Sequence, residues 1–291
     1  MAKVNDDYPK KDQISDEQLK AMATAQYHSG GEQSTSKFPT EIIELPSKGL
    51  LYAEDNPLSS GKIEMKYMTA KEEDILTTQS YIKQGVVLDK LFKALIVSNG
   101  EGRPVKYDDI LVGDKNAVMI AARVLGYGKE YQIEIDTPSG TKQKENIDLT
   151  ELKDKEFDES LITPGINSFE FELPISKKKI KFKLLSHKET TAVDSELKRI
   201  QKAARRDNAP DGQLTTRLVH SILSVDDMTE RQEIRKYVKN ELLARDSLAL
   251  REYMKKVQPD INLTVELIDE ETGDPFDINL PIDVNFFWPN S

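Results

Sequence analysis

The stretch Lys62-Ile63-Glu64-Met65-Lys66-Tyr67-Met68-Thr69-Ala70-Lys71-Glu72 returns later in the chain, altered, as Lys179-Ile180-Lys181-Phe182-Lys183-Leu184-Leu185-Ser186-His187-Lys188-Glu189. Five of the 11 aligned pairs are identical. Both stretches begin with alternating apolar and charged residues, which is typical of a strand with one buried face. Both end in Thr/Ser-x-x-Glu, the capping-box pattern that starts a helix. We therefore expect Thr69 with Glu72, and Ser186 with Glu189, to cap two equivalent strand-to-helix corners.

The similarity continues beyond these corners in the same order. Leu91-Phe92 and Leu95-Ile96 correspond to Leu218-Val219 and Ile222-Leu223, Asp114 corresponds to Asp246, and the strand-like segment 131–135 corresponds to 263–267. The sequence thus predicts two tandem, diverged copies of one unit, over residues 38–155 and 156–291. The alternative is a chance similarity among Lys- and Glu-rich stretches.

The expected fold class is α+β, in which antiparallel β-hairpins flank a small helical bundle in each copy. Strands are expected at 42–45, 62–68, 169–173 and 180–184, and closing hairpins at 131–149 and 263–280. Between them we expect a helix ending at Gly85, an amphipathic stripe from Leu88 to Ile96, and helices near 114–125, 187–206, 214–224, 229–243 and 246–257. Asp114 is interpreted as a helix cap.

Residues 1–37 precede the first copy and have a different composition. They are polar and include the run Ser29-Gly30-Gly31-Glu32-Gln33-Ser34-Thr35-Ser36, which is typical of a linker. A capping-box pattern at Ser15–Gln18 predicts a short helix to about Gln26. We expect a flexible N-terminal arm that has too few apolar residues for a core of its own.

Composition excludes several classes of function. The net charge of −10 disfavours general binding to a phosphate backbone. The chain has no cysteine, which excludes disulfides, thiol nucleophiles and Cys-based zinc sites. No apolar run reaches the roughly 20 residues of a membrane helix, and no apolar signal core is expected at the N-terminus.

No motif for catalysis or cofactor binding stands out. Gly126-Tyr127-Gly128-Lys129 lacks the spacing of a phosphate loop, and no GxSxG elbow is present. His28, His187 and His220 are scattered and form no metal-binding pair. The many carboxylate pairs are interpreted as solvated loops and helix starts. We therefore expect neither an enzyme, nor a cofactor, nor a metal site.

Two segments are candidates for contact with a partner. One is basic and spans residues 177–206, with Lys177, Lys178, Lys198, Arg199, Arg205 and Arg206 among its cations. A solvated outer face is the favoured interpretation, and an acidic protein partner or a nucleic acid is the alternative. The other segment is Phe286-Phe287-Trp288-Pro289, whose aromatic side chains either anchor a partner or fold back over the second core.

Several of these segments resemble a known family. Leu45-Pro46-Ser47-Lys48-Gly49-Leu50-Leu51-Tyr52, Asn56-Pro57-Leu58, the run from Lys62 to Asp74 and terminal Phe287-Trp288-Pro289 are similar to the baseplate hub assembly proteins of T-even-type contractile-tailed bacteriophages. The resemblance is clear in the first copy, looser in the second, and does not include residues 1–37. The strand-and-capped-helix unit is also similar to phage tail assembly chaperones.

This resemblance implies a non-enzymatic subunit of the tail baseplate hub, or a baseplate assembly factor, that acts through contacts with other tail and baseplate proteins. It implies a place in the virion after assembly in the host cytoplasm, and no small-molecule substrate. Two alternatives remain open. One is a tail assembly chaperone that is not retained in the virion, and the more distant one is a nucleic-acid binder that uses residues 177–206.

Overall fold

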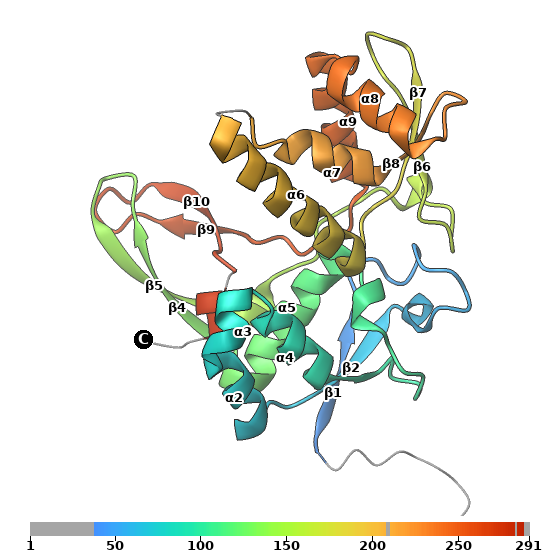
Figure 1. Ribbon diagram of the computed structural model, residues 1–291. Coiled ribbons are helices and arrows are strands. Elements are labelled where there is room, and N and C mark those ends of the chain that lie inside the picture. The colour runs from blue at the N-terminus through green and yellow to red at the C-terminus, as the bar shows by residue number, and fades with distance from the viewer. Residues whose placement is uncertain (1–37, 208–209, 283, 288–291) are drawn as a thin grey trace, which may run out of the picture. The chain divides into compact units, whose positions relative to one another are not determined.

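The computed structural model describes residues 38–207, 210–282 and 284–287. In this part of the chain, helices and short antiparallel strands follow one another as expected for an α+β fold (Figure 1). The first half contains β1 (Thr40–Glu44), β2 (Lys62–Lys66), α2 (Ala70–Thr77), α3 (Gln79–Gln84), α4 (Val87–Leu95), β3 (Ile96–Ser98), α5 (Val112–Tyr127), β4 (Glu130–Asp136) and β5 (Lys142–Asp148). The second half contains β6 (Phe169–Glu172), β7 (Lys179–Phe182), α6 (His187–Asp207), α7 (Gln213–Ser221), β8 (Ile222–Val225), α8 (Arg231–Asn240), α9 (Ala244–Val257), β9 (Thr264–Ile268) and β10 (Pro275–Asn279).

Each half has a small antiparallel sheet, and its middle strand is the start of the repeated stretch, Lys62–Lys66 in one half and Lys179–Phe182 in the other. The strand orders are β1-β2-β3 and β6-β7-β8. Ile63 and Met65 of β2 are fully buried, as are Ile180 and Phe182 of β7, because alternation places every second side chain on the core face. The pairing register shifts between Glu64 and Met65 in the first sheet and between Lys181 and Phe182 in the second.

The two sheets therefore share strand order, direction and the place of an irregularity. These correspondences fall at positions that align in the sequence. The origin of the two halves by duplication stays a prediction.

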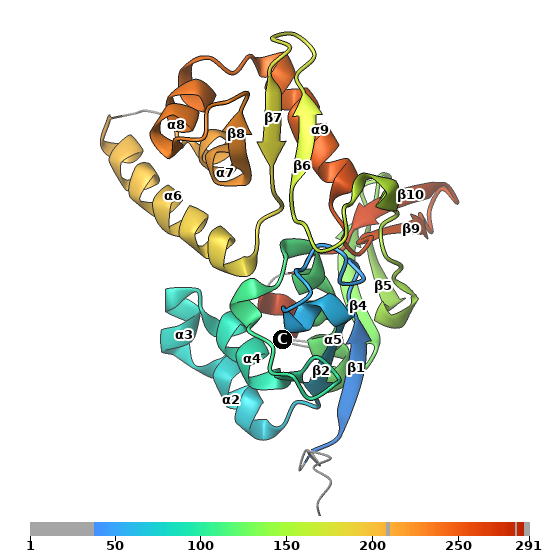
Figure 2. The same ribbon diagram turned by 90° about the vertical axis from the view of Figure 1, so that its right-hand side faces the viewer.

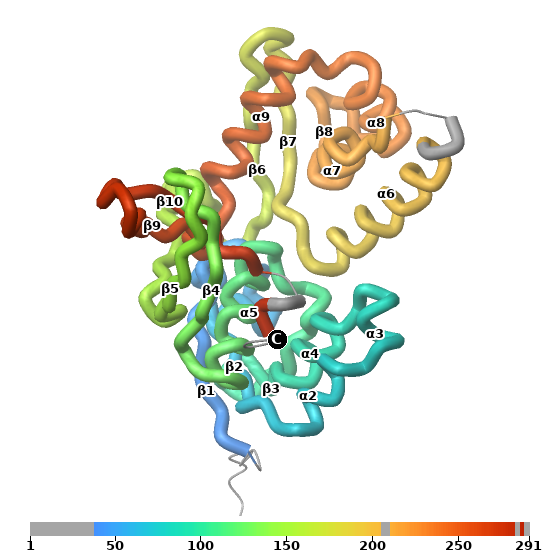
Figure 3. The backbone as a smooth tube through the Cα atoms, turned by 90° about the vertical axis from the view of Figure 1, so that its left-hand side faces the viewer, coloured from blue at the N-terminus to red at the C-terminus, as the bar shows by residue number. Residues whose placement is uncertain are grey.

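The two closing hairpins lie beside each other. β4 pairs with β5, and β9 pairs with β10. The Gln143 amide donates to the carbonyl oxygen of Ile268 at 2.9 Å, and the Ser139 backbone amide donates to the Asp269 carboxylate at 3.1 Å. The two hairpins are thus hydrogen-bonded to each other, and Figure 3 shows them as neighbouring green and red segments of the backbone tube.

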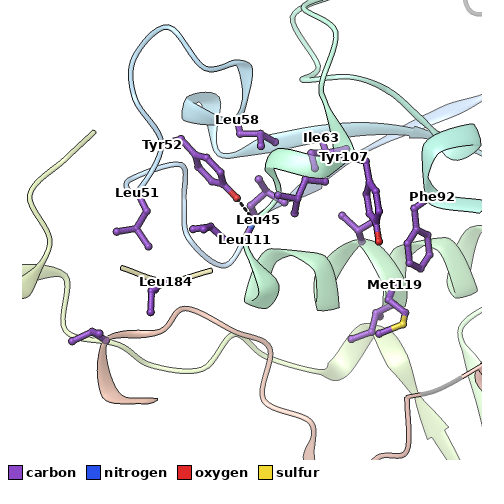
Figure 4. Packing of buried hydrophobic residues seen from close by; sticks show 14 of the residues in the cluster. Leu45, Leu51, Tyr52, Leu58, Ile63, Phe92, Tyr107, Leu111, Met119 and Leu184 are labelled. Carbon is purple, nitrogen blue, oxygen red and sulfur yellow. Dashed lines mark hydrogen bonds between the residues drawn. The ribbon is translucent and has the colours of Figure 1, made fainter. Parts of the chain in front are cut away.

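Buried residues of both halves belong to one hydrophobic core. Figure 4 shows Leu45, Leu58 and Ile63 of the first half packed above helix α5, with Leu184 of the second half near the start of this helix. The expected division into separate domains at residues 155 and 156 stays a prediction.

The halves meet where α9 ends and α5 begins (Figure 2). A bridge joins Leu111 to Ser186, the Val112 amide donates to the Leu185 carbonyl, and the His187 amide donates to the Ile110 carbonyl. Gly113 allows the backbones to approach, because a Cβ atom there would lie 1.8 Å from the Pro259 carbonyl oxygen.

Three local expectations need correction. The helix expected to end at Gly85 is two helices, α2 and α3, with a break at Thr78, and Gly85 closes α3 in a left-handed conformation. Ile96 and Leu223, expected at the ends of helices, belong to strands β3 and β8, because α4 ends at Leu95 and α7 at Ser221, and the residues that follow pair with β2 and β7. Asp114 lies in the first turn of α5 after the cap residue Leu111, so it is not the cap.

Candidate interaction surfaces and their framework

The first strand-to-helix corner is held by Glu72. Its carboxylate accepts hydrogen bonds from the Thr69 amide at 3.1 Å, the Thr69 hydroxyl at 2.6 Å and Lys66 Nζ at 2.8 Å. Burial raises the pKa of Glu72, but the bonds from Lys66 and Thr69 outweigh it and leave the pKa below its ordinary value. The carboxylate is thus fully occupied with structural donors.

The second corner repeats this arrangement with Glu189. Its carboxylate accepts from the Ser186 amide at 3.0 Å and from the Ser186 hydroxyl at 3.2 Å, and it pairs with Lys183. Burial again acts to raise the pKa, and Lys183 with the Ser186 bonds lowers it below the usual range. Both corners combine a capping box with an ion pair to the preceding strand.

Asp114 is the hydrogen-bonding partner of the motif at residues 45–52, Leu-Pro-Ser-Lys-Gly-Leu-Leu-Tyr. Its buried carboxylate accepts from the Ser47 amide at 2.9 Å, the Ser47 hydroxyl at 2.7 Å and the Tyr52 hydroxyl at 2.6 Å. The Tyr52 oxygen in turn accepts from the Leu111 amide at 2.9 Å, the contact drawn in Figure 4. Burial raises the pKa of Asp114, while the Tyr52 and Ser47 bonds act to lower it. The motif fastens the turn after β1 to the start of α5.

Asp246 has the equivalent role in the second half. Its carboxylate accepts from the backbone amides of Ile175 at 2.8 Å and Ser176 at 3.0 Å, in the turn after β6. Burial raises its pKa, and the bonds from Ile175 and Ser176 bring it below the ordinary value. Sequence reasoning aligned Asp114 with Asp246 but missed this role. The signal was available in the serines that follow Leu45-Pro46 and Leu173-Pro174.

A polar cluster at the junction of the halves was also missed. His187 lies 3.3 Å from the Asp89 carboxylate and 3.4 Å from Lys115 Nζ, and its ring packs on Tyr107 with centroids 4.3 Å apart. The Tyr107 hydroxyl donates to Asp89 at 3.3 Å. Burial lowers the pKa of Lys115. Burial also acts to raise the pKa of Asp89, but His187, Lys115 and Tyr107 together lower it below its ordinary value. No short-range pattern connects these four residues, since they come from four separate elements.

A cavity of about 210 Å³ lies beside this junction. Its lining includes Asp114 and Ser47 from the first half and Thr190, Arg217 and Gln258 from the second. The Asp114 carboxylate in this lining accepts three hydrogen bonds from Ser47 and Tyr52 of its own chain.

The structure divides the basic segment between two places. Lys177 and Lys178 lie in the β6–β7 turn, near Glu172 at 3.8 Å and Asp226 at 4.0 Å. Lys198 and Arg199 are exposed on α6, which α7 and β8 separate from that turn (Figure 2). Neither of these two forms an ion pair within the described part of the chain. The side chains of Arg205 and Arg206 lie outside the described residues.

The expectation for the terminal aromatic residues is corrected in part. Phe286 and Phe287 are buried, at 1% and 0% exposure, so they are core residues and not exposed anchors. They pack in the first half, against Tyr131 at 4.9 Å and Phe92 at 6.1 Å between ring centroids, and Arg123 Nε donates to the Phe286 carbonyl at 3.0 Å. They fold back, but not over the second core. Trp288 and Pro289 lie outside the described residues.

No group of three or more His, Asp or Glu side chains among the described residues could hold a metal ion. No helix in that same part is long and apolar enough to cross a membrane.

Comparison with known proteins now gives the class. The pattern of the family described as "T4 bacteriophage base plate protein" matches residues 41–288. No curated protein and no solved structure matches the chain. Because the family match extends over most of the sequence, the chain belongs to this family of phage baseplate proteins. It is a component of the T4-type baseplate system with its place in the phage tail, and the resemblance seen in the sequence is confirmed.

Proposed function

We propose that this protein is a non-enzymatic hub subunit or assembly factor of the baseplate, which works by binding other tail and baseplate proteins. The family match over residues 41–288 carries this proposal. The framework supports it, because Glu72, Glu189, Asp114 and Asp246 each satisfy their carboxylates with donors of their own chain. Glu72, Asp114 and Asp246 are buried and Glu189 is half-buried, and all four hold segments of the fold together.

In this proposal the chain has three parts: an N-terminal arm over residues 1–37, which lies outside the described residues, and two related units over 38–155 and 156–291. Other tail and baseplate proteins are the partners, and assembly takes place in the host cytoplasm. The exposed cations Lys198 and Arg199 of α6 are proposed contacts for an acidic partner surface. Their lack of intramolecular ion pairs in the described region leaves them available.

The test is quantitative mass spectrometry of purified particles, with the stoichiometry measured against a known baseplate protein. A hub subunit gives a fixed, non-zero number of copies in every particle. If purified tails contain no copy, the structural role is wrong. A stable complex with another tail protein in infected cells would then identify the chaperone alternative.

A second experiment separates protein binding from nucleic-acid binding. The double variant Lys198→Glu/Arg199→Glu is compared with Lys188→Glu/Lys202→Glu, a control that changes the same net charge on the same helix. Loss of assembly in complemented phage by the first variant alone supports the proposed contact. Salt-sensitive retention of the wild-type protein on DNA would favour the nucleic-acid alternative.

A further inference from the structure

The two segments that form the contact between the halves each have an equivalent elsewhere in the molecule, and these two equivalents do not contact each other. At the contact, the segment Ile110–Val112 pairs with the strand-to-helix corner Leu185–His187. Both components occur once more in the molecule. The segment that matches Ile110–Val112 in the second half is Leu242–Ala244, at the start of α9. The corner that matches Leu185–His187 in the first half is Met68–Ala70, at the start of α2.

The matching segments have the same local geometry. The Lys115 amide donates to the Leu111 carbonyl, and the Ser247 amide donates to the Leu243 carbonyl. At the corners, the Glu73 amide donates to the Thr69 carbonyl just as the Thr190 amide donates to the Ser186 carbonyl. Each open segment therefore presents its backbone in the same conformation as its paired equivalent.

The hydrogen-bonding groups used at the internal contact have no partner at the open segments among the described residues. The contact pairs the Val112 amide with the Leu185 carbonyl and the Ile110 carbonyl with the His187 amide. Within residues 38–207 and 210–282, no hydrogen bond is made by the equivalent Ala244 amide and Leu242 carbonyl. The same holds, over those ranges, for the equivalent Met68 carbonyl and Ala70 amide.

Apolar side chains are also more exposed at the unpaired segment near the start of α9 than at the internal contact. Leu111, which is covered by the second half, is 6% exposed, and the equivalent Leu243 is 47% exposed. Leu248 and Ile175 are also exposed, at 48% and 45%, in the two segments that Asp246 joins. Clustered exposed apolar residues mark interaction sites more often than single ones do. We call Ile175, Leu242, Leu243, Ala244 and Leu248 the open end.

The open end and the free corner lie at opposite extremes of the described fold. Figure 2 shows α9 beginning at the upper end of the molecule and α2 beginning at the lower end. A contact between them cannot form within one chain, but it can form between two chains.

We propose that the protein associates head to tail with a second copy of itself, so that the open end of one molecule receives the Met68–Ala70 corner of the next. The internal junction is the template for this contact, with two backbone hydrogen bonds and burial of Leu243. Such a contact is heterologous, because it joins two different surfaces, and it produces an open chain or a closed ring of subunits.

One residue difference between the two halves should make the contact between molecules less tight than the internal contact. Arg245 stands at the position of Gly113, where the internal junction brings backbone against backbone. A side chain there keeps the neighbour further away. We therefore expect association that depends on protein concentration, unlike the permanent junction inside the chain.

Sedimentation equilibrium of the purified full-length protein tests this proposal. The mean mass should rise with concentration, and Leu243→Asp should raise the dissociation constant about tenfold or more, because a charge is buried without a partner. Leu243 is the residue before the first helical residue of α9, where Asp is favoured, so this variant is expected to fold. The matched control is Leu214→Asp, an equally exposed leucine at the start of α7, which should associate like the wild type. A protein that stays monomeric, or a Leu243→Asp variant that associates normally, overturns the proposal.

Cross-linking then identifies the surfaces. Since the chain has no cysteine, Ala70→Cys and Leu243→Cys each introduce a unique thiol. A short bis-maleimide should join the two variants to each other when they are mixed, and should join neither variant to itself. Cross-linking of Ala70→Cys to itself, or a mixture of Leu214→Cys with Ala70→Cys that reacts equally well, contradicts the head-to-tail arrangement. These results concern the purified protein alone, so they leave the baseplate role to its own test.

Discussion

The hydroxyl of Tyr52 lies 2.6 Å from the carboxylate of Asp114, 62 residues further along the chain, and both groups are buried. This bond, together with the one from the Leu111 amide to Tyr52, fastens the turn after β1 to the first turn of α5 at the junction of the two halves. A tyrosine that only filled space would need no hydroxyl. Here the oxygen satisfies two buried groups at once.

Tyr52→Phe should therefore destabilise the protein by about 1–3 kcal/mol, since Asp114 loses a donor and the Leu111 amide loses its acceptor inside the core. Urea denaturation of the purified protein measures this free energy of unfolding. Tyr81→Phe is the control, because the Tyr81 hydroxyl has no hydrogen bond in the described structure. Equal effects of the two changes would show that the Tyr52 hydroxyl is not structural.

Glu196 should make stability depend on acid pH. It joins α6 to α7 and α8 through His220 at 3.0 Å and through Arg235. The bond from Arg235 lowers its pKa to about 2, with His220 contributing. The pKa is thus lower in the folded state than in the unfolded state, so this stabilisation is present above the unfolded pKa and is lost as pH falls towards 2.

The matched comparison for this pH dependence is Glu196→Gln. The wild type should lose about 2 kcal/mol more than the variant between neutral pH and the acid limit. Thermal unfolding followed by circular dichroism across this range provides the measurement. Parallel curves for the two proteins would mean that Glu196 does not titrate as described.

Glu72→Ala should destabilise the protein by about 1–2 kcal/mol, because it removes the acceptor for the Thr69 amide and leaves Lys66 without its ion pair. Asp74→Ala, an exposed acid in the same helix with no side-chain bond among the described residues, should change stability by less than about 0.5 kcal/mol. Chemical denaturation of both variants decides between them. A larger effect of Asp74→Ala would contradict the importance of the corner.

Phe287→Ala should cost about 3–5 kcal/mol, since a fully buried ring is deleted next to Phe92. The control is Ile166→Ala, at a position that is 51% exposed. Loss of baseplate assembly without any loss of stability in Phe287→Ala would reveal a direct partner contact by this ring, contrary to its burial.

The sequence was sufficient to predict the local pieces of this fold. Alternation in Lys62–Lys66 and Lys179–Phe182 indicated half-buried strands, and the Thr/Ser-x-x-Glu patterns indicated how the following helices begin. Both signals are local, because strand periodicity and helix capping involve residues within four positions of one another.

What joins the pieces could not be predicted, because it depends on contacts between residues far apart in the chain. Asp114 was interpreted as a helix cap, whereas its carboxylate reaches Ser47 and Tyr52. The His187–Asp89 contact and the position of Phe286 beside Tyr131 link residues about a hundred positions apart or more. No spacing rule in the sequence connects these residues, and their burial depends on the three-dimensional fold.

The return of the chain's last segment to the first half has a consequence for biosynthesis. A ribosome releases the first half long before Phe286 and Phe287 are made, so that half emerges with a gap beside Phe92 and Tyr131. The nascent chain must hold this unfinished surface until Phe286 and Phe287 have been made. Any product that terminates before residue 286 would lack both rings and present an incomplete core to the cell's proteases, so that molecules with both rings would be favoured among those that accumulate.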